Sequence, residues 1–519
     1  MSWAETEFET LDLGDTRLNK RAINLIEDFS AKPTASIPQA CGDWADTQAA
    51  YRFFDNDKVD WQDILAPHIK NSVARMAAHD VVLCIQDTTE LDFKGKKATG
   101  LGPLSYERQR GMYVHPTYAV SSAREPLGIL DAWMWAREFK GKDGKRPGMK
   151  ESLRWIEGYE RLAELAPQLP STRMIYVADR EADIIALLVR ARDLKMPLDW
   201  LVRSKNDRTL PDKDKLWDSV TKTESLGEIR FNLPKSREHA AREVVQTVWA
   251  KSVALPDGKK GFVQATCIVA KEINPPTGEE PVEWRLLTNL SVETLEQAQQ
   301  VIGWYLARWE IEMLFHVFKN GCKIEAMQLG HIKNIERALV VYLIVAWRIA
   351  RLMRLGRTCP DMDAALMFDH DEWRAAFILN KKKPPVKPPT LNEVVRLVAR
   401  LGGFLARKGD GEPGVKTIWL GMQRIIDFAS GVRYSRGLQE GVLSPNPRKF
   451  QSNDFRCHFE HPSRDIVHET GNVTEFWSIL VPLFGVTRTT VYVTPVFRPM
   501  VRRKPAGLAQ KSPQCRLSN

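Results

Sequence analysis

Apolar residues in the middle of the chain follow two alternating patterns, which predict strands and helices in turn. Continuous apolar runs at residues 81–85 and 174–177 are typical of buried strands, and segments of helical periodicity lie between them. From residue 206 to residue 290 the pattern changes to short alternating strands, at 228–233, 243–250, 261–270 and 284–288. This order predicts an α/β fold that carries an antiparallel β-insertion.

Helical periodicity marks the rest of the predicted fold. Long helical patterns cover residues 292–322 and 334–355, and a lysine- and proline-rich stretch at 381–389 is typical of a linker. The predicted organisation is a helical N-terminal domain (1–70), an α/β domain (71–370) with its β-insertion (206–290), a linker (371–390), a C-terminal helical domain (391–433) and a tail (434–519).

Composition and charge exclude several classes of protein. The 519 residues are 43% hydrophobic and 27% charged, which is typical of a folded protein and excludes a disordered or disulfide-scaffold chain. The seven cysteines are odd in number, and no pair has metal-ligand spacing, so we expect a reducing compartment and no structural zinc. The acidic first residues do not resemble a signal peptide, and no apolar run is long enough to span a membrane. We therefore expect a cytoplasmic protein without a membrane partner.

The net charge of +10 is unevenly distributed. Residues 1–70 carry a net charge of −6, residues 71–433 carry +10 and residues 434–519 carry +6. A polyanion-binding surface is therefore expected mainly in the middle stretch.

Each of the two predicted core strands is followed by an aspartate, Asp87 after the first and Asp179 after the second. Acids at the carboxyl ends of buried strands lie at the rim of an α/β sheet, where ligands are usually bound. Each aspartate taken alone is also a good N-cap for the helix that follows a strand. The two aspartates therefore predict a functional site only if other polar or charged side chains lie near them.

A third group of polar residues lies on one face of the helix predicted from residue 297 to residue 319. At about 100° per residue, five side chains fall within an arc of roughly 80°: Tyr305, Arg308, Glu312, His316 and Lys319. A solvated, salt-bridged face is the ordinary explanation of such charges. That explanation does not account for an acid at the end of each strand.

Three carboxylates beside a cationic, aromatic face suit one chemical task. Asp87, Asp179 and Glu312 can hold two Mg²⁺ or Mn²⁺ ions, which prefer oxygen ligands, and the cations and the phenol can hold a phosphodiester backbone beside them. The residues therefore predict metal-dependent phosphoryl transfer on DNA. A glycosidase built on paired carboxylates is disfavoured by the basic helix face.

The spacing of Tyr305, Arg308, Glu312 and Lys319 resembles the signature helix of the insertion-sequence-four family of bacterial DNA transposases, within it the branch of the transposon Tn-five enzyme. Neighbouring motifs agree in order from about residue 3 to about residue 433. They include Leu13-Gly14-Asp15, Tyr51-Arg52-Phe53, Asp87-Thr88-Thr89, Asp179-Arg180-Glu181-Ala182-Asp183-Ile184, Val202-Arg203-Ser204-Lys205, Glu272-Ile273-Asn274-Pro275-Pro276, Leu286-Leu287-Thr288 and Ala399-Arg400-Leu401-Gly402-Gly403-Phe404.

The resemblance implies a fold and an activity. It implies a ribonuclease-H-like core whose acid triad is Asp87, Asp179 and Glu312, with two metal ions in each active site. It also implies a cut-and-paste transposase that frees a 3′ hydroxyl, forms and opens a DNA hairpin, and joins the ends to target DNA. Residues 391–433 are implied to be a dimerisation domain, so that a homodimer brings two double-stranded transposon ends together.

The resemblance also implies DNA contacts for particular residues. Tyr305, Arg308, Lys319 and Arg203 match positions that contact the transposon end. Trp284 resembles an aromatic residue that stacks on a flipped base, and a core tryptophan of the β-insertion is the alternative.

The chain departs from the family pattern in two places. His316 stands where the family's closer relatives carry a lysine, and an imidazole is cationic only part of the time near neutral pH. Arg21 and Arg52 resemble DNA-contacting positions of the N-terminal domain, although that domain is acidic here.

Two other functions remain open from the sequence. A structure-specific, metal-dependent nuclease on the same core would cut DNA without joining it. A DNA-binding regulator of transposition would bind without catalysis, and the intact triad argues against it. The tail after Tyr434 is a DNA-binding arm, an extra domain or a dispensable extension.

Overall fold

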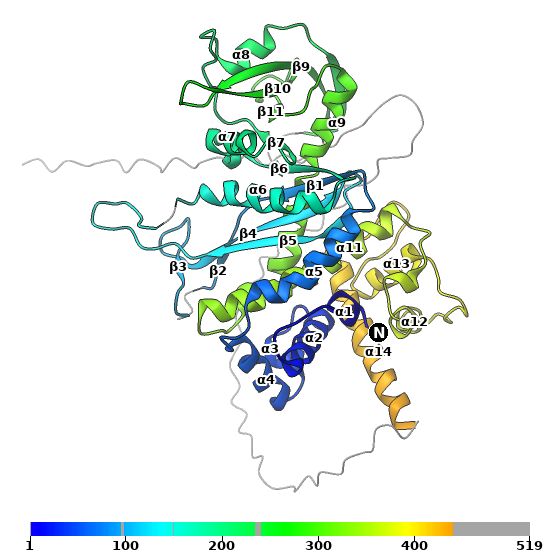
Figure 1. The fold of residues 1–519 in the computed structure, drawn as a ribbon. Helices are drawn as coiled ribbons and strands as arrows, with labels where there is room; N and C mark the ends of the chain where they lie inside the picture. Colours follow the sequence, from blue (N-terminus) through cyan, green and yellow to red (C-terminus); the bar gives the residue numbers. More distant parts are fainter. Residues whose placement is uncertain (1, 95–97, 149, 234–239, 440–519) are drawn as a thin grey trace, which may run out of the picture.

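The computed structural model describes residues 2–94, 98–148, 150–233 and 240–439 (Figure 1). Within them the chain has a mixed α/β fold. The tail from residue 440 onward lies outside the described residues.

A large mixed sheet forms the middle of the molecule. Its strand order is β2-β4-β1-β6-β7-β11-β10-β9-β8, with β3 and β5 also paired to β4. The first part consists of β1 (Val81–Gln86), β2 (Thr89–Asp92), β3 (Gly102–Pro103), β4 (Arg110–Ser121), β5 (Pro126–Trp135), β6 (Arg173–Ala178) and β7 (Asp199–Arg203). In this part β1, β6 and β7 run parallel to one another, and β4 is antiparallel to β1.

The apolar runs of β1 and β6 arise because these strands are buried on both faces. Alternate side chains point to opposite faces, so Leu83 and Ile85 enter one hydrophobic core, and Val82 and Cys84 enter another. The second core is covered by α6 (Leu153–Leu165) and α7 (Ile185–Asp193). The two strands predicted at 81–85 and 174–177 are thereby confirmed.

The β-insertion continues this sheet. After α8 (Leu216–Thr221), an antiparallel series follows, made of β8 (Gly227–Leu233), β9 (Arg242–Pro256), β10 (Phe262–Glu272) and β11 (Glu283–Thr288). These are the four strands predicted from the alternating pattern. Their last member, β11, pairs with β7, where Leu286 lies opposite Arg203. The insertion is therefore an extension of the central sheet.

The helix predicted over residues 297–319 is divided in the structure. It consists of α9 (Leu295–Leu306), α10 (Trp309–His316) and the π-helical turn Val317–Gly321. Between α9 and α10 the backbone N–H of Arg308 bonds to Tyr305 O at 3.0 Å, three residues back instead of four. This tightened turn changes the direction of the side chains, so a straight helical projection does not hold across it.

The long helix α11 (Ile332–Thr358) runs through the centre of the helical part and is buried on nearly all sides. It contacts α5 (Trp61–Met76), β5, and both terminal sets of helices. These sets are α1 (Trp3–Glu7), α2 (Thr16–Ala31), α3 (Ile37–Cys41) and α4 (Trp44–Phe54), and at the other end α12 (His370–Leu379), α13 (Leu391–Leu401) and α14 (Val415–Gln439).

The predicted linker at 371–390 differs from the structure in its first half. Residues 370–379 form α12, which buries Trp373 and Phe377 and packs on α13 and α14. Only the proline-rich remainder, 381–389, has neither helix nor strand. The prolines that follow α12 favoured a linker, and the few apolar residues of α12 were too weak a signal for a helix beside them.

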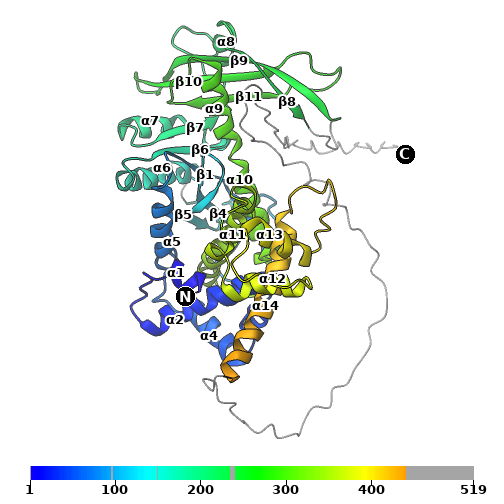
Figure 2. The ribbon, with the colours of Figure 1, turned by 90° about the vertical axis from the view of Figure 1, so that its right-hand side faces the viewer.

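The N- and C-terminal helices lie side by side at the end of the molecule opposite the β-insertion (Figures 1 and 2). Thr34, just after α2, hydrogen-bonds to Gln423 of α14 at 3.3 Å. Buried Arg348 of α11 joins the same regions, because it bonds to Ser30 of α2 at 2.9 Å and pairs with Glu372 of α12 at 3.6 Å.

Within the described ranges, the helices are all too short or too polar to cross a bilayer. The five cysteines of these ranges are free thiols: Cys41, Cys84, Cys267, Cys322 and Cys359.

The first helix is tied to α5 by a buried ionic group. Glu7 accepts from Arg75 Nη1 and Nη2 at 2.9 Å, and from His68 Nδ1 at 2.5 Å. The N–H of Ile129 donates to His68 Nε2, so the ring proton is on Nδ1. Burial raises the pKa of Glu7, but the hydrogen bonds and charges of His68 and Arg75 outweigh it, and the net pKa is lowered.

We therefore expect Glu7→Gln to lower the free energy of unfolding by about 3 kcal/mol, because it leaves Arg75, whose side chain is only 20% exposed, without its ion-pair partner. The contribution of Glu7 should be present above the unfolded pKa of 4.5 and disappear as the pH falls through the lower folded pKa. Urea unfolding at pH 7 and pH 4 measures both effects. The exposed Glu9→Gln variant is the control, and equal stability of the two variants would contradict the prediction.

Candidate active site

Asp87 and Asp179 lie next to each other at one edge of the sheet. They follow Gln86 and Ala178, which are paired in the parallel register of β1 and β6. Neighbouring strands are about 4.8 Å apart, so the two aspartates leave the sheet side by side. Asp87 Oδ1 accepts from the Thr88 N–H at 2.8 Å, and Asp179 Oδ1 accepts from the Glu181 N–H at 2.7 Å. Asp179 is thus also an N-cap, and the two interpretations are compatible.

Glu312 reaches the same edge from α10. Burial raises the pKa of Asp87 to about 7, the positive charge of Arg308 opposes this rise, and the negative charges of Asp179 and Glu312 add to it. The charges of both other acids thus reach Asp87, and the three carboxylates form one electrostatic cluster near this edge of the sheet.

Arg308 is the counter-ion of this cluster. Its Nη1 pairs with Asp87 Oδ2 and lies 3.7 Å from Glu312 Oε1, and the residue is only 8% exposed. Tyr305 is 5% exposed, and its pKa is raised by burial, while the charges of Arg308 and Arg203 lower it. The charge of Arg203, at the end of β7, thus reaches Tyr305. In this conformation Tyr305 and Arg308 are both buried, and Arg308 contacts two of the three carboxylates.

Lys319 and His316 lie away from that cluster. Lys319 Nζ donates to the carbonyl of Glu90 in β2 at 2.9 Å and lies 3.4 Å from Glu325 Oε1. The His316 ring is 5.6 Å from the Trp419 ring of α14, and burial, with a smaller effect of the Lys416 charge, lowers its pKa from 6.5. The imidazole is therefore mainly neutral near pH 7, and it packs against the C-terminal helices.

Trp284 is part of the core of the β-insertion. It is 2% exposed, and its ring stacks on Phe231 of β8 with centroids 5.6 Å apart and planes at 14°. This packing supports the core alternative that the sequence leaves open. Because Trp284 is buried, a base could stack on it only after neighbouring side chains moved.

Arg21 and Arg52 lie on the N-terminal helices, outside the carboxylate cluster. Arg21 Nη1 pairs with Asp46 at 2.7 Å, which reduces its availability to a phosphate. Arg52 is exposed, and its Nη2 donates to Gln48 at 3.4 Å.

The carboxylates fit a divalent metal ion in chemistry and in charge. Oxygen-only ligands suit Mg²⁺ or Mn²⁺, and the pKa of Asp87 is raised by burial and, to a smaller extent, by the negative charges of Asp179 and Glu312, which a cation would offset. Within the described parts of the chain, however, no three His, Cys, Asp or Glu side chains are grouped closely enough to hold an ion. Arg308 Nη1 lies between Asp87 and Glu312 instead, so a metal ion would compete with this guanidinium.

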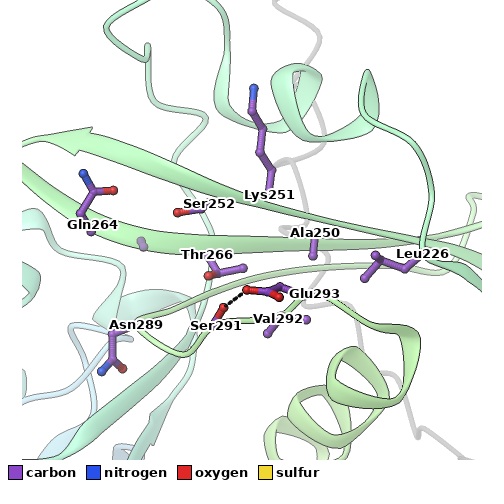
Figure 3. Close-up of a pocket in the computed structure, with 11 residues that line it drawn as sticks. Leu226, Ala250, Lys251, Ser252, Gln264, Thr266, Asn289, Ser291, Val292 and Glu293 are labelled. Carbon is purple, nitrogen blue, oxygen red and sulfur yellow. Dashed lines mark hydrogen bonds between the residues drawn. The ribbon is translucent and has the colours of Figure 1, made fainter.

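A separate hollow of about 510 Å³ opens on the β-insertion (Figure 3). It is lined by β9, β10 and the loop after β11, and Ser291 donates to Glu293 there at 3.0 Å. Asn289, on its rim, bonds to Asp199 at the start of β7, whereas Arg203 lies at the other end of that strand. The hollow is therefore at the edge of the sheet opposite the carboxylates.

The sequence did not indicate a second layer of polar residues behind Asp87 and Asp179. Thr88, His115, Arg154 and Glu181 form a connected hydrogen-bonded group there. Arg154 lies on the amphipathic helix α6, whose charged residues are typical of a solvated face. No local sequence pattern distinguishes Arg154 from the other charged residues of that face.

Two regions of the chain match known protein families. Residues 1–59 match the family described as "Transposase DNA-binding", and residues 344–442 match "Transposase Tn5 dimerisation domain". The chain belongs to the Tn5-like transposases. All three carboxylates of this Tn5-like transposase lie between the two matched regions.

A solved structure, described as "Cryo-EM structure of piggyBac transposase synaptic complex with hairpin DNA (SNHP)", is also similar. It is 9% identical, the match covers 87% of this chain and 83% of that chain, and the TM-score is 0.35. At this TM-score the similarity does not bear on the mechanism of the Tn5-like transposase.

The burial of Trp284 leads to a prediction about stability. Trp284→Ala should lower the free energy of unfolding by about 3–5 kcal/mol, because it leaves a cavity beside Phe231. The control is Trp44→Ala, at a side chain that is 73% exposed, and it should change stability by less than about 0.5 kcal/mol. Urea unfolding followed by circular dichroism makes the comparison. Wild-type stability of Trp284→Ala would show that the residue has no core role.

Proposed function

We propose that this Tn5-like transposase cuts transposon ends and joins them to target DNA by metal-dependent phosphoryl transfer at Asp87, Asp179 and Glu312. The observation that supports the proposal is the register of β1 and β6, which places Asp87 and Asp179 side by side, together with Arg308, which contacts both Asp87 and Glu312. The family matches supply the DNA context.

The topology supports a ribonuclease-H-like assignment of the core. The first five long strands are arranged in the order β5-β4-β1-β6-β7, with β4 antiparallel and β6 and β7 parallel to β1. This arrangement agrees with the core implied by the sequence motifs. It is also consistent with a place in the insertion-sequence-four family.

The residues of the site have separate roles in the proposed mechanism. Asp87, Asp179 and Glu312 would hold the metal ions and keep their negative charge at the strand ends. When bound, two Mg²⁺ or Mn²⁺ ions supply activation of the attacking oxygen and stabilisation of the leaving oxygen. Arg308 would release Asp87 as an ion enters and would then be free to pair with a phosphate. Most of the catalytic effect would come from positioning and charge stabilisation.

The proposed reaction has four steps on DNA. Water cuts one strand at the transposon end and frees a 3′ hydroxyl. This hydroxyl attacks the opposite strand to form a hairpin, a second water opens the hairpin, and the 3′ ends join target DNA.

The proposed partners follow from the two matched regions. Residues 1–59 would bind double-stranded end DNA, and α12, α13 and α14 would contribute to a homodimer that pairs two ends. Arg203 and Lys319 remain candidates for backbone contacts, and Lys319 Nζ would exchange its present contacts with the Glu90 carbonyl and the Glu325 carboxylate for a phosphate. A transposase that acts on bacterial DNA would work in the cytoplasm, at the nucleoid.

The triad is tested by substitution. Asp179→Asn and Glu312→Gln should each lower the rate of end cleavage in Mg²⁺ by at least about 10²- to 10³-fold, because a neutral amide is a poor metal ligand. Binding of end DNA, measured by gel shift, should be nearly unchanged. Asp193→Asn, at an exposed acid at the end of α7, is the matched control and should keep full activity. Retained cleavage in either triad variant would overturn the assignment.

Strand joining separates a transposase from a nuclease. Supplied with pre-cut ends and a target plasmid, the wild-type protein should form joined products in Mg²⁺. A protein that cuts uncut ends but never joins pre-cut ends would be the structure-specific nuclease.

The raised pKa of Asp87 gives the pH dependence. Because protons compete with metal ions for this carboxylate, the cleavage rate at limiting Mg²⁺ should fall as the pH drops through about 7. Raising the Mg²⁺ concentration should move the midpoint to lower pH, which a pH–rate series at two concentrations measures. A midpoint near 4 at both concentrations would show that Asp87 titrates as an ordinary exposed acid.

A further inference from the structure

Arg154 of α6 contacts the chain immediately behind both aspartates. Its Nε donates to Thr88 Oγ1 at 3.2 Å, and its Nη2 donates to Glu181 Oε2 at 2.8 Å. A third bond runs from Nη1 to the carbonyl of Glu151 at 2.6 Å, and the side chain is only 8% exposed. The planar guanidinium thus joins two separate chain segments in a fixed geometry.

These two segments are the ones that determine where the catalytic acids lie. Thr88 directly follows Asp87, and its N–H donates to Asp87 Oδ1. The N–H of Glu181 donates to Asp179 Oδ1. The strand register aligns Asp87 and Asp179, but beyond Gln86 and Ala178 no β1–β6 pairing continues. Arg154 therefore links the two segments just beyond the last paired residues of β1 and β6.

The Thr88 side of this link is anchored in the core. Thr88 Oγ1 lies 2.9 Å from His115 Nδ1, and His115 Nε2 lies 3.3 Å from Gln86 Oε1. Gln86 Nε2 donates to Thr117, so its Oε1 is the acceptor for His115 Nε2. Because the buried imidazole is neutral, Nδ1 then accepts from the Thr88 hydroxyl, and Thr88 Oγ1 remains free to accept from Arg154.

Close packing of α6 on β1 makes the reach of Arg154 possible. A Cβ atom at Gly158, one turn along the helix, would stand 2.2 Å from Gln86 Nε2, so only glycine permits this approach. The guanidinium is also held over aromatic rings, 5.1 Å from Trp135 and 5.3 Å from Trp155. A lysine could replace the charge of Arg154 but lacks the separate Nε and Nη2 donors that bond to the two segments.

We infer that Arg154 is a positioning residue that fixes the separation of Asp87 and Asp179 by bridging Thr88 and Glu181. The inference rests on the proposed function, in which these two acids share the metal ions. The two carboxylates repel each other, and the bridge through Arg154 keeps the segments that carry them from moving apart. Its loss should weaken metal binding without removing any ligand. Partners that orient metal ligands typically contribute about 10- to 100-fold to metal affinity.

The test compares Arg154→Met and Arg154→Lys with Arg161→Met. Arg161 lies on the same helix, is 45% exposed and pairs with the largely buried Asp131 at 2.6 Å, so its substitution also removes one arginine from a charged pair. Two quantities are measured: Mn²⁺ binding to the protein, from the electron paramagnetic resonance of the free ion, and the Mg²⁺ concentration for half-maximal end cleavage. Melting temperature and end-DNA binding are recorded for each variant.

We expect Arg154→Met to weaken Mn²⁺ binding and to raise the half-maximal Mg²⁺ concentration by about 10-fold or more. End-DNA binding should not change. Arg154→Lys should recover only part of the loss, and Arg161→Met should behave as wild type. Unchanged metal dependence in Arg154→Met would overturn the inference, since the bridge would then be structural only.

A double-mutant cycle covers the case in which Arg154→Met does not fold. Glu181→Gln weakens the other half of the bridge at a side chain that is 57% exposed. It should raise the Mg²⁺ requirement in the wild-type background and have a smaller further effect beside Arg154→Lys, which has already lost part of the bridge. Independent effects of the two substitutions, or no effect of Glu181→Gln, would contradict the bridge. A wild-type protein that cleaves end DNA in neither Mg²⁺ nor Mn²⁺ would overturn the proposed function itself.

Discussion

The parallel, in-register pairing of β1 with β6 is the constraint on which the site depends. It places Asp87 and Asp179 side by side, and α10 adds Glu312 to the same edge of the sheet. Carboxylates held this close repel one another, and the chain balances them with the guanidinium of Arg308. The cluster is thus built around a position for a cation, which Arg308 fills in this conformation and metal ions fill in the proposed reaction.

The break between α9 and α10 explains how Arg308 comes to have this role. At the tightened turn after Leu306, the side chains of Tyr305 and Arg308 point inward, while the π-helical turn directs Lys319 toward β2. The helix α10, with Arg308 as its N-cap, therefore supplies both the third acid, Glu312, and the guanidinium that pairs with the acids. Glu310 of α10 also pairs with Arg354 of α11, which fixes the helix on the centre of the molecule.

The strands and the acids of the site could be predicted because their signals are local. A strand buried on both faces is a continuous apolar run, and an acid directly after it is visible in the sequence. The partners of Trp284 and Arg154 could not be predicted, because Phe231 and Thr88 lie more than fifty residues away and meet them only in the folded chain. The helix break was missed for another reason: residues 305–310 contain no proline or glycine to mark it.

The central claim is that one cluster of three carboxylates both cuts and joins DNA. The most direct measurement incubates the purified protein with DNA that carries its own flanking inverted repeats, with and without Mg²⁺, and separates the products by size. The account predicts hairpin-ended and target-joined products that appear only with Mg²⁺. Products that form equally without a divalent ion, or the absence of any cleaved product with it, would contradict the account.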